Sequence, residues 1–225
     1  MFEPIKFATK GGGDATGEMV APEGEGRAPA VVLIQEWWGL NGQIRDIAQK
    51  LAKEGFVVAM PDLYHGRWTV DAEEAAKLMN ALDWPRALDE IAGAAAFLAS
   101  HPRSNGNVGI IGFCLGGALS FAAATKIPEL KAVVPYYGLP PAGSVDYTNV
   151  KAPILAHFAS QDEWARADLA QKLQAEMNGR GQSMELHVYE AGHAFSHEAR
   201  RDVYVPEAAK LAWSRTVAFL HKHLG

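Results

Sequence analysis

Apolar and polar residues alternate in blocks along the chain, and these blocks predict strands and helices that take turns. Short continuous apolar runs are typical of strands buried on both faces, whereas apolar residues spaced three and four apart indicate a helix with one buried side. The pattern predicts strands at 2–9, 16–21, 30–35, 56–60, 108–113, 131–137, 152–159 and 184–189. It predicts helices at 43–54, 71–82, 86–100, 115–125 and 165–178, and a last helix that Pro206 opens.

This alternation favours an α/β protein with a mostly parallel, doubly wound sheet and helices on both faces. No repeat, low-complexity tract or long linker divides the 225 residues, so we expect one domain over 1–225. In such a sheet the ligand site lies at the carboxyl ends of the strands. Reactive side chains follow directly after six predicted strands and should therefore share one edge: Glu36, the loop 61–66, Cys114, Tyr136, Asp162 and His193.

Composition narrows the function mainly by exclusion. The net charge is −5 and no basic stripe occurs, so we expect neither nucleic acid nor an anionic membrane as a partner. No apolar run approaches the roughly 18 residues that span a bilayer, and we expect no signal peptide at the N-terminus. The single cysteine cannot form an internal disulfide, which favours a reduced, cytoplasmic setting.

The one cysteine stands in a distinctive local pattern. Gly112, Cys114 and Gly116 form G-x-C-x-G between a predicted strand and a predicted helix. This is the nucleophile elbow G-x-S-x-G with sulfur in place of oxygen, and its glycines allow two backbones to approach closely. A helix N-terminus favours negative charge, so we expect a lowered thiol pKa and a place for an oxyanion. The alternative is a buried cysteine that only packs.

Cys114, Asp162 and His193 follow one another in the order of the α/β-hydrolase triad. His193 would act as base and acid, and Asp162 would orient the imidazole. Asp162 could instead be a turn or N-cap residue. His193 and His197 are four apart, as in some metal sites, but no further ligand has suitable spacing, so we expect no metal. No chemistry is assigned to the other histidines: His65, His101, His157 and His187 as loop or strand-end residues, and His221 and His223 at a helix end.

Glu36 directly follows an apolar strand, which leaves two interpretations. It is either a solvated loop acid or a partly buried carboxyl with a raised pKa that faces Cys114 as a second proton acceptor. In the second case the backbone N–H groups of Trp37 and Leu115 are the natural oxyanion donors. The indoles of Trp37 and Trp38 either roof the pocket or pack, and the sequence does not choose between these.

Six motifs together resemble the dienelactone hydrolases (carboxymethylenebutenolidases) of the α/β-hydrolase superfamily. The resemblance covers nearly the whole chain and implies Cys114, Asp162 and His193 as the triad, Glu36 as the acid that contacts the thiol, and Trp37 and Leu115 as oxyanion donors. It also implies a cytoplasmic, usually monomeric enzyme without a cofactor. The motifs are QEWWGLN at 35–41, PDLY at 61–64, GFCLGG at 112–117, YYG at 136–138, QD at 161–162 and AGH at 191–193. Side chains expected in the substrate pocket are Trp38, Tyr64, Tyr136, Phe195 and His197.

The chain departs from the family pattern where the prototype binds the substrate carboxylate with two arginines. Those positions align with Ala72 and His197 here, and an imidazole does not replace a bidentate guanidinium without loss. Ala76 and Met79, in the predicted helix that contains Ala72, align with two positions that are aromatic in the prototype. The remaining candidates for such a cation are Arg67, Arg86, Arg200 and Arg201.

We therefore expect a carboxylesterase or lactonase that cleaves small esters or lactones through a thioester on Cys114. Two alternatives stay open. One is a strict dienelactone hydrolase despite the missing arginines, and the other is a non-catalytic member that binds a small molecule or a redox signal through Cys114.

Overall fold

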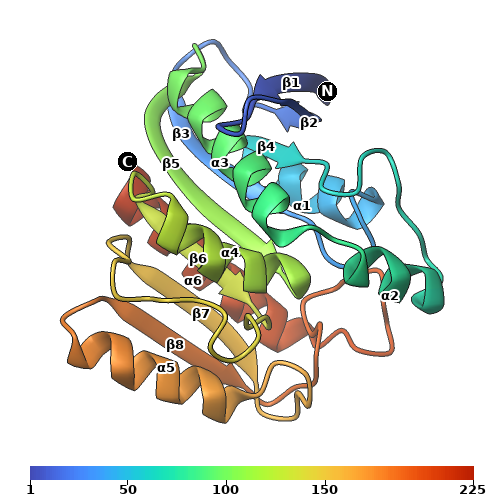
Figure 1. Cartoon of the computed structure of the whole chain (residues 1–225), viewed down its shortest axis with the longest axis vertical. Helices are drawn as coiled ribbons and strands as arrows, with labels where there is room; N and C mark the ends of the chain where they lie inside the picture. Colours follow the sequence, from blue (N-terminus) through green and yellow to red (C-terminus); the bar gives the residue numbers. More distant parts are fainter.

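The structure is a computed structural model that describes residues 1–225. Eight strands form one sheet in the order β1-β2-β4-β3-β5-β6-β7-β8 (Figure 1). The β1–β2 and β2–β4 pairs are antiparallel and all others are parallel, so the predicted mostly parallel α/β sheet is confirmed. The strands are β1 (Glu3–Ala8), β2 (Asp14–Val20), β3 (Ala28–Ile34), β4 (Val57–Pro61), β5 (Ser104–Phe113), β6 (Ala132–Tyr136), β7 (Ile154–Ala159) and β8 (Met184–Tyr189).

Five helices lie between strands and a sixth follows the last strand, and local signals explain where several begin. Asn41, Asp71 and Asp83 each accept a hydrogen bond from a backbone N–H of the following helix, which satisfies a donor that has no partner inside the helix. The helices are α1 (Gly42–Lys53), α2 (Ala72–Asn80), α3 (Trp84–Ser100), α4 (Leu115–Lys126), α5 (Ala167–Gly179) and α6 (Pro206–Leu224). None of them is long and apolar enough to cross a membrane.

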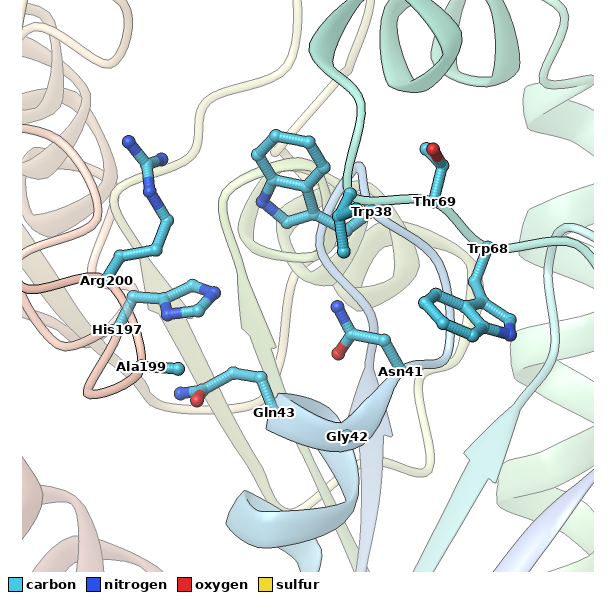
Figure 2. Close-up of a pocket in the computed structure, with 10 residues that line it drawn as sticks. Trp38, Asn41, Gly42, Gln43, Trp68, Thr69, His197, Ala199 and Arg200 are labelled. Atoms are coloured by element: carbon cyan, nitrogen blue, oxygen red, sulfur yellow. The ribbon is translucent and has the colours of Figure 1, made fainter.

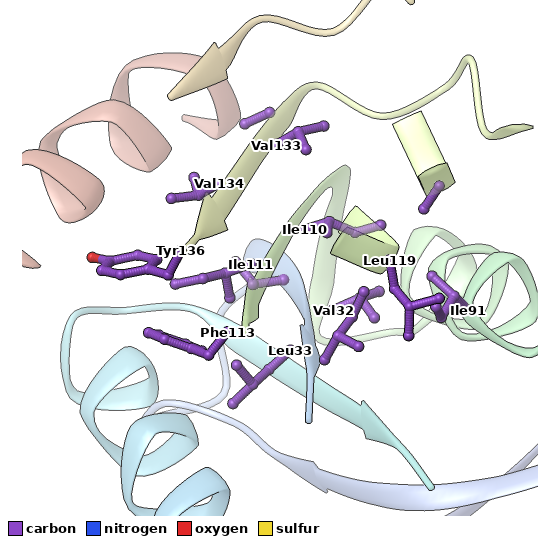
Figure 3. Packing of buried hydrophobic residues seen from close by; sticks show 14 of the residues in the cluster. Val32, Leu33, Ile91, Ile110, Ile111, Phe113, Leu119, Val133, Val134 and Tyr136 are labelled. Atoms are coloured by element: carbon purple, nitrogen blue, oxygen red, sulfur yellow. The ribbon is translucent and has the colours of Figure 1, made fainter. Parts of the chain in front are cut away.

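Successive side chains of the central strands face opposite layers of helices (Figure 3). Val32 of β3 lies toward Ile91 of α3 and Leu119 of α4, whereas Leu33 points the other way. All four side chains are fully buried, and each such burial stabilises the fold by roughly 1.5–3 kcal/mol. The carboxyl ends of β3, β5, β6, β7 and β8 thus project from a rigid, densely packed layer.

Strand β5 begins at Ser104, four residues before the apolar run that predicted it. Its first part, Ser-Asn-Gly-Asn, carries no apolar signal and is held because Ser104 pairs with Ala28 of β3. His157 is a second difference, since it lies inside β7 and is fully buried rather than at a loop or strand end. Its Nδ1 is 2.9 Å from the Tyr189 hydroxyl and its Nε2 is 3.0 Å from the Thr216 hydroxyl, so both ring nitrogens are satisfied without a charge.

Candidate active site

Cys114 occupies a strained turn between β5 and α4. Its φ of 53° and ψ of −114° lie where side chains are rarely tolerated, which costs about 1–3 kcal/mol. A backbone hydrogen bond holds the turn in place. The Cys114 N–H donates to the carbonyl of Tyr136 at 3.0 Å. A side chain on Gly112 would collide with the Gly116 carbonyl, and one on Gly116 would collide with the Ile34 carbonyl. The close approach predicted for these two glycines is therefore present.

Three side chains that follow three different strands form a continuous line of contacts. The Cys114 Sγ lies 3.2 Å from His193 Nε2, and His193 Nδ1 lies 2.7 Å from Asp162 Oδ2. The other oxygen of Asp162 accepts the backbone N–H groups of Trp164 at 2.8 Å and Ala165 at 3.0 Å. Asp162 is thus also the turn residue that the alternative interpretation described, while the N-cap of α5 is Arg166.

Backbone donors converge on the sulfur. The N–H groups of Trp37, after β3, and Leu115, at the start of α4, both lower the pKa of the Cys114 thiol, so both lie close to the sulfur. These are the two groups expected as oxyanion donors. A carbonyl oxygen bound there would meet two donors that are already oriented, which is the arrangement that stabilises a developing negative charge.

The thiol itself is not activated at rest. Burial, and next the charge of Glu36, raise the pKa of Cys114 to about 12, and the N–H groups of Leu115 and Trp37 only partly offset this. The expected lowering of the thiol pKa is therefore wrong, because desolvation of the partly buried sulfur outweighs the effect of the helix N-terminus. The neutral thiol needs a base in contact with it, and His193 Nε2 is in that position.

Glu36 is only 3% exposed, so it is not a solvated loop acid. Burial raises its pKa to about 7, and the positive charge of Arg200 opposes part of that shift. Its Oε2 lies 3.3 Å from Nε2 of His197, which is also buried. The carboxyl group therefore faces an imidazole on one side and influences the thiol electrostatically.

Comparison with known families matches residues 16–224 to the dienelactone hydrolase family. The chain belongs to this family. It is 37% identical to the protein usf of Aquifex pyrophilus, with all of both chains covered. It is 33% identical to a carboxymethylenebutenolidase of Pseudomonas putida, with 92% of each chain covered. A crystal structure of a "putative dienelactone hydrolase" from Klebsiella pneumoniae superposes with a TM-score of 0.85 at 25% identity, covering 99% of both chains.

Membership identifies the chain as a hydrolase with the α/β-hydrolase fold, as the resemblance implied. The structure also shows where the side chains expected in the substrate pocket lie. Of the pocket residues expected, Tyr136 is not at the thiol, because its hydroxyl bonds Thr216 of α6 at 2.7 Å. Tyr137 takes the place beside the imidazole instead, with its ring 5.2 Å from that of His193. Phe195 is fully buried against Tyr137 and packs behind the site.

Tryptophans of this dienelactone hydrolase family member gather beside the imidazole. The ring of Trp37 lies 4.8 Å from Trp38 and 6.5 Å from Trp164, and Trp164 lies 6.5 Å from His193. Trp164, two residues after Asp162, is 78% exposed, and the sequence analysis did not place it beside the imidazole.

Four buried polar side-chain atoms have no hydrogen-bond partner, and all lie at this end of the sheet. Gln35 and Glu36 follow β3, Tyr64 follows β4, and His197 follows His193 by four residues. Buried polar atoms without partners are rare in folded proteins and are commonly found where a ligand or water binds. They are Gln35 Nε2, Glu36 Oε2, Tyr64 OH and His197 Nδ1.

A cavity of about 550 Å³ opens beside the site (Figure 2). Figure 2 shows Trp38 and Arg200 along one side of it and His197 next to Arg200. Arg200 is the one arginine among the four candidates that lines this cavity. Arg86 instead forms a 2.9 Å ion pair with Glu90. The remaining lining residues are Asn41, Gly42, Gln43, Trp68, Thr69, Val70 and Ala199.

Proposed function

We propose that the protein hydrolyses small carboxylic esters or lactones through a thioester on Cys114. The observation that carries this proposal is the unbroken line from Cys114 Sγ through His193 to Asp162, with contacts of 3.2 and 2.7 Å. Each group has a chemical task that its position allows. The proposal is supported by family membership, since the relative from Pseudomonas putida is named carboxymethylenebutenolidase, a lactone hydrolase.

In the first half-reaction, His193 Nε2 accepts the thiol proton while the sulfur attacks the carbonyl carbon of the substrate. The carbonyl oxygen becomes an oxyanion facing the N–H groups of Trp37 and Leu115. When the tetrahedral intermediate collapses, the bond from carbon to the alcohol oxygen breaks, and His193 returns its proton to that oxygen. An ester then releases an alcohol, whereas a lactone leaves its hydroxyl attached to the acyl chain.

In the second half-reaction, water loses a proton to His193 and adds to the thioester carbon. The carbon–sulfur bond breaks, the thiol regains a proton, and the carboxylic acid leaves. Asp162 accepts a hydrogen bond from His193 throughout, so the imidazole keeps its proton on Nδ1 and offers Nε2 to the reaction.

Cys114→Ala should abolish turnover of cis-dienelactone and of a short neutral p-nitrophenyl ester, measured as kcat/KM on the same preparation. Mass spectrometry of the quenched wild-type enzyme should show one acyl group, and the alanine variant should show none. Unchanged turnover by Cys114→Ala would overturn the mechanism. Failure of the folded wild-type enzyme to turn over either ester or lactone class would favour a binding protein.

A strict preference for dienelactone is the second candidate. The observation in its favour is Arg200, whose guanidinium lines the cavity beside Trp38 and could bind a substrate carboxylate. The same two substrates decide the matter. A large preference for cis-dienelactone that Arg200→Gln removes would support the strict enzyme, and a preference for the neutral ester would support the broader carboxylesterase.

A further inference from the structure

A buried carboxyl and a buried imidazole face each other next to the nucleophile. Glu36 Oε2 and His197 Nε2 are 3.3 Å apart, and the two side chains are only 4% and 7% exposed. Neither Glu36 Oε2 nor His197 Nδ1 has a hydrogen-bond partner. Apart from its contact with His197, the carboxyl oxygen therefore has little in the protein to stabilise a negative charge.

The charged groups around the pair do not neutralise it. Arg200 is the cation that acts on both members, but its guanidinium is bonded to Asp202 at 2.6 Å and partly exposed. Lys50 of α1 approaches the loop that carries His197, but it is paired with Glu198 of that loop at 2.5 Å. The hydroxyl of Tyr137, which directly follows β6 and is bonded to Ser196, and the thiol of Cys114 are both uncharged at rest.

We propose that Glu36 and His197 hold one exchangeable proton between them, and that His197 is the positioning residue that decides whether Glu36 is charged beside the thiol. With the proton bound, the pair is a neutral carboxylic acid facing a neutral imidazole, or a carboxylate facing an imidazolium. In both forms the net charge of the pair is zero. Loss of the proton to solvent leaves a carboxylate and a neutral imidazole, with a net charge of −1.

The environment selects among these forms. Burial lowers the pKa of His197 and raises that of Glu36 to about 7, so the form with the proton on Glu36 is favoured over the imidazolium. His197 also lines the cavity of Figure 2, so its ring separates Glu36 from the space that a ligand would fill. An arginine in its place would be charged at every accessible pH and would hold Glu36 as a carboxylate.

The consequence for the thiol follows from charge alone. The carboxylate form of Glu36 raises the pKa of Cys114, whereas the neutral acid removes that repulsion. Keeping the proton on the pair therefore makes formation of the thiolate easier. This consequence for turnover rests on the proposed function, but the shared proton itself does not.

Infrared difference spectroscopy can follow the protonated carboxyl of Glu36 directly, with Glu36→Gln identifying its band. The wild-type band should disappear with a midpoint near pH 7, the value to which burial raises the pKa of Glu36. His197→Arg should move that midpoint down by about 1–3 pH units, because an adjacent cation favours the carboxylate. His197→Gln cannot take up the proton, so the carboxylate–imidazolium form is lost and the midpoint should stay at or fall slightly below the wild-type value.

His187→Arg is a matched control, since His187 also pairs with a glutamate, Glu185, but lies outside the site. It should leave the Glu36 band unchanged. Thermal unfolding of each variant checks that it is folded. An unchanged midpoint in His197→Arg, or no Glu36-dependent band between about pH 5 and pH 9, would overturn the inference. Because Cys114→Ala should show the same titration, loss of the proposed esterase activity and loss of the shared proton are separate results.

Discussion

Replacing Asp162 with asparagine reverses a hydrogen bond without changing the shape of the site. Asp162 Oδ1 accepts two backbone N–H groups at 2.8 and 3.0 Å, so the single carbonyl oxygen of an asparagine would remain there. Its NH₂ group would then face His193 Nδ1, where Asp162 Oδ2 now lies at 2.7 Å. Two donors cannot pair, so Nδ1 would become an acceptor and the ring proton would move to Nε2. That tautomer cannot accept the thiol proton.

The expected loss is about 10⁴-fold in kcat, the size found when the same exchange forces the wrong tautomer in a serine protease triad. This corresponds to about 5 kcal/mol in the activation free energy. Steady-state kinetics with the neutral p-nitrophenyl ester would measure it. The folding free energy should change by no more than about 1 kcal/mol, since both backbone donors of the turn keep an acceptor.

Asp168→Asn provides the matched control. Asp168 lies in the first turn of α5 and forms an ion pair with Arg166 at 2.9 Å that is exposed to solvent and therefore weak. This variant should keep the wild-type kcat. A kcat in Asp162→Asn within tenfold of wild type, with the protein folded, would refute the role of Asp162 in setting the tautomer.

Two further expectations concern packing and pH. Gly116→Ala should destabilise the protein by about 1–3 kcal/mol in urea unfolding and lower kcat/KM, because its Cβ would meet the Ile34 carbonyl; Gly179→Ala, with open space around it, is the control. If both alanine variants unfold alike, the close approach at the elbow is not rigid. Burial holds the pKa of His157 well below its usual value. Below about pH 6.5 the imidazole therefore binds a proton in the unfolded chain but stays neutral in the folded chain. Stability should therefore fall by up to about 1.4 kcal/mol per pH unit as the pH drops from 6.5, and His157→Gln should reduce this slope, which an unchanged slope would contradict.

The arrangement of strands and helices followed from the sequence because its signals are local. Apolar runs such as 30–35 and 108–113 indicate buried inner strands, and Pro206 marks where the last helix starts. The parallel topology then brings strand ends together, which is why Cys114, Asp162 and His193 could be grouped before any coordinates. The glycines at 112 and 116 were predictable for the same reason, since the sharp turn leaves no room for a side chain at either of these two positions.

Tertiary packing decided the features that depend on which groups become neighbours and how much water reaches them. Tyr136 and Tyr137 are adjacent in sequence, yet the first turns to Thr216 and the second to His193, and no pattern in the chain distinguishes them. The pKa of Cys114 rose instead of falling because burial outweighs the helix N-terminus, and the extent of burial is a property of the whole fold.

The sequence by itself determined the identity and order of the reactive groups, because an elbow motif and strand ends are written in consecutive residues. Only the tertiary structure decided their charge states. Glu36 and His197 are 161 residues apart in number but 3.3 Å apart in space, and the contact exists because separate loops close over the same sheet edge. Electrostatic free energies depend on distance and on exclusion of water, and both arise only when the chain is packed.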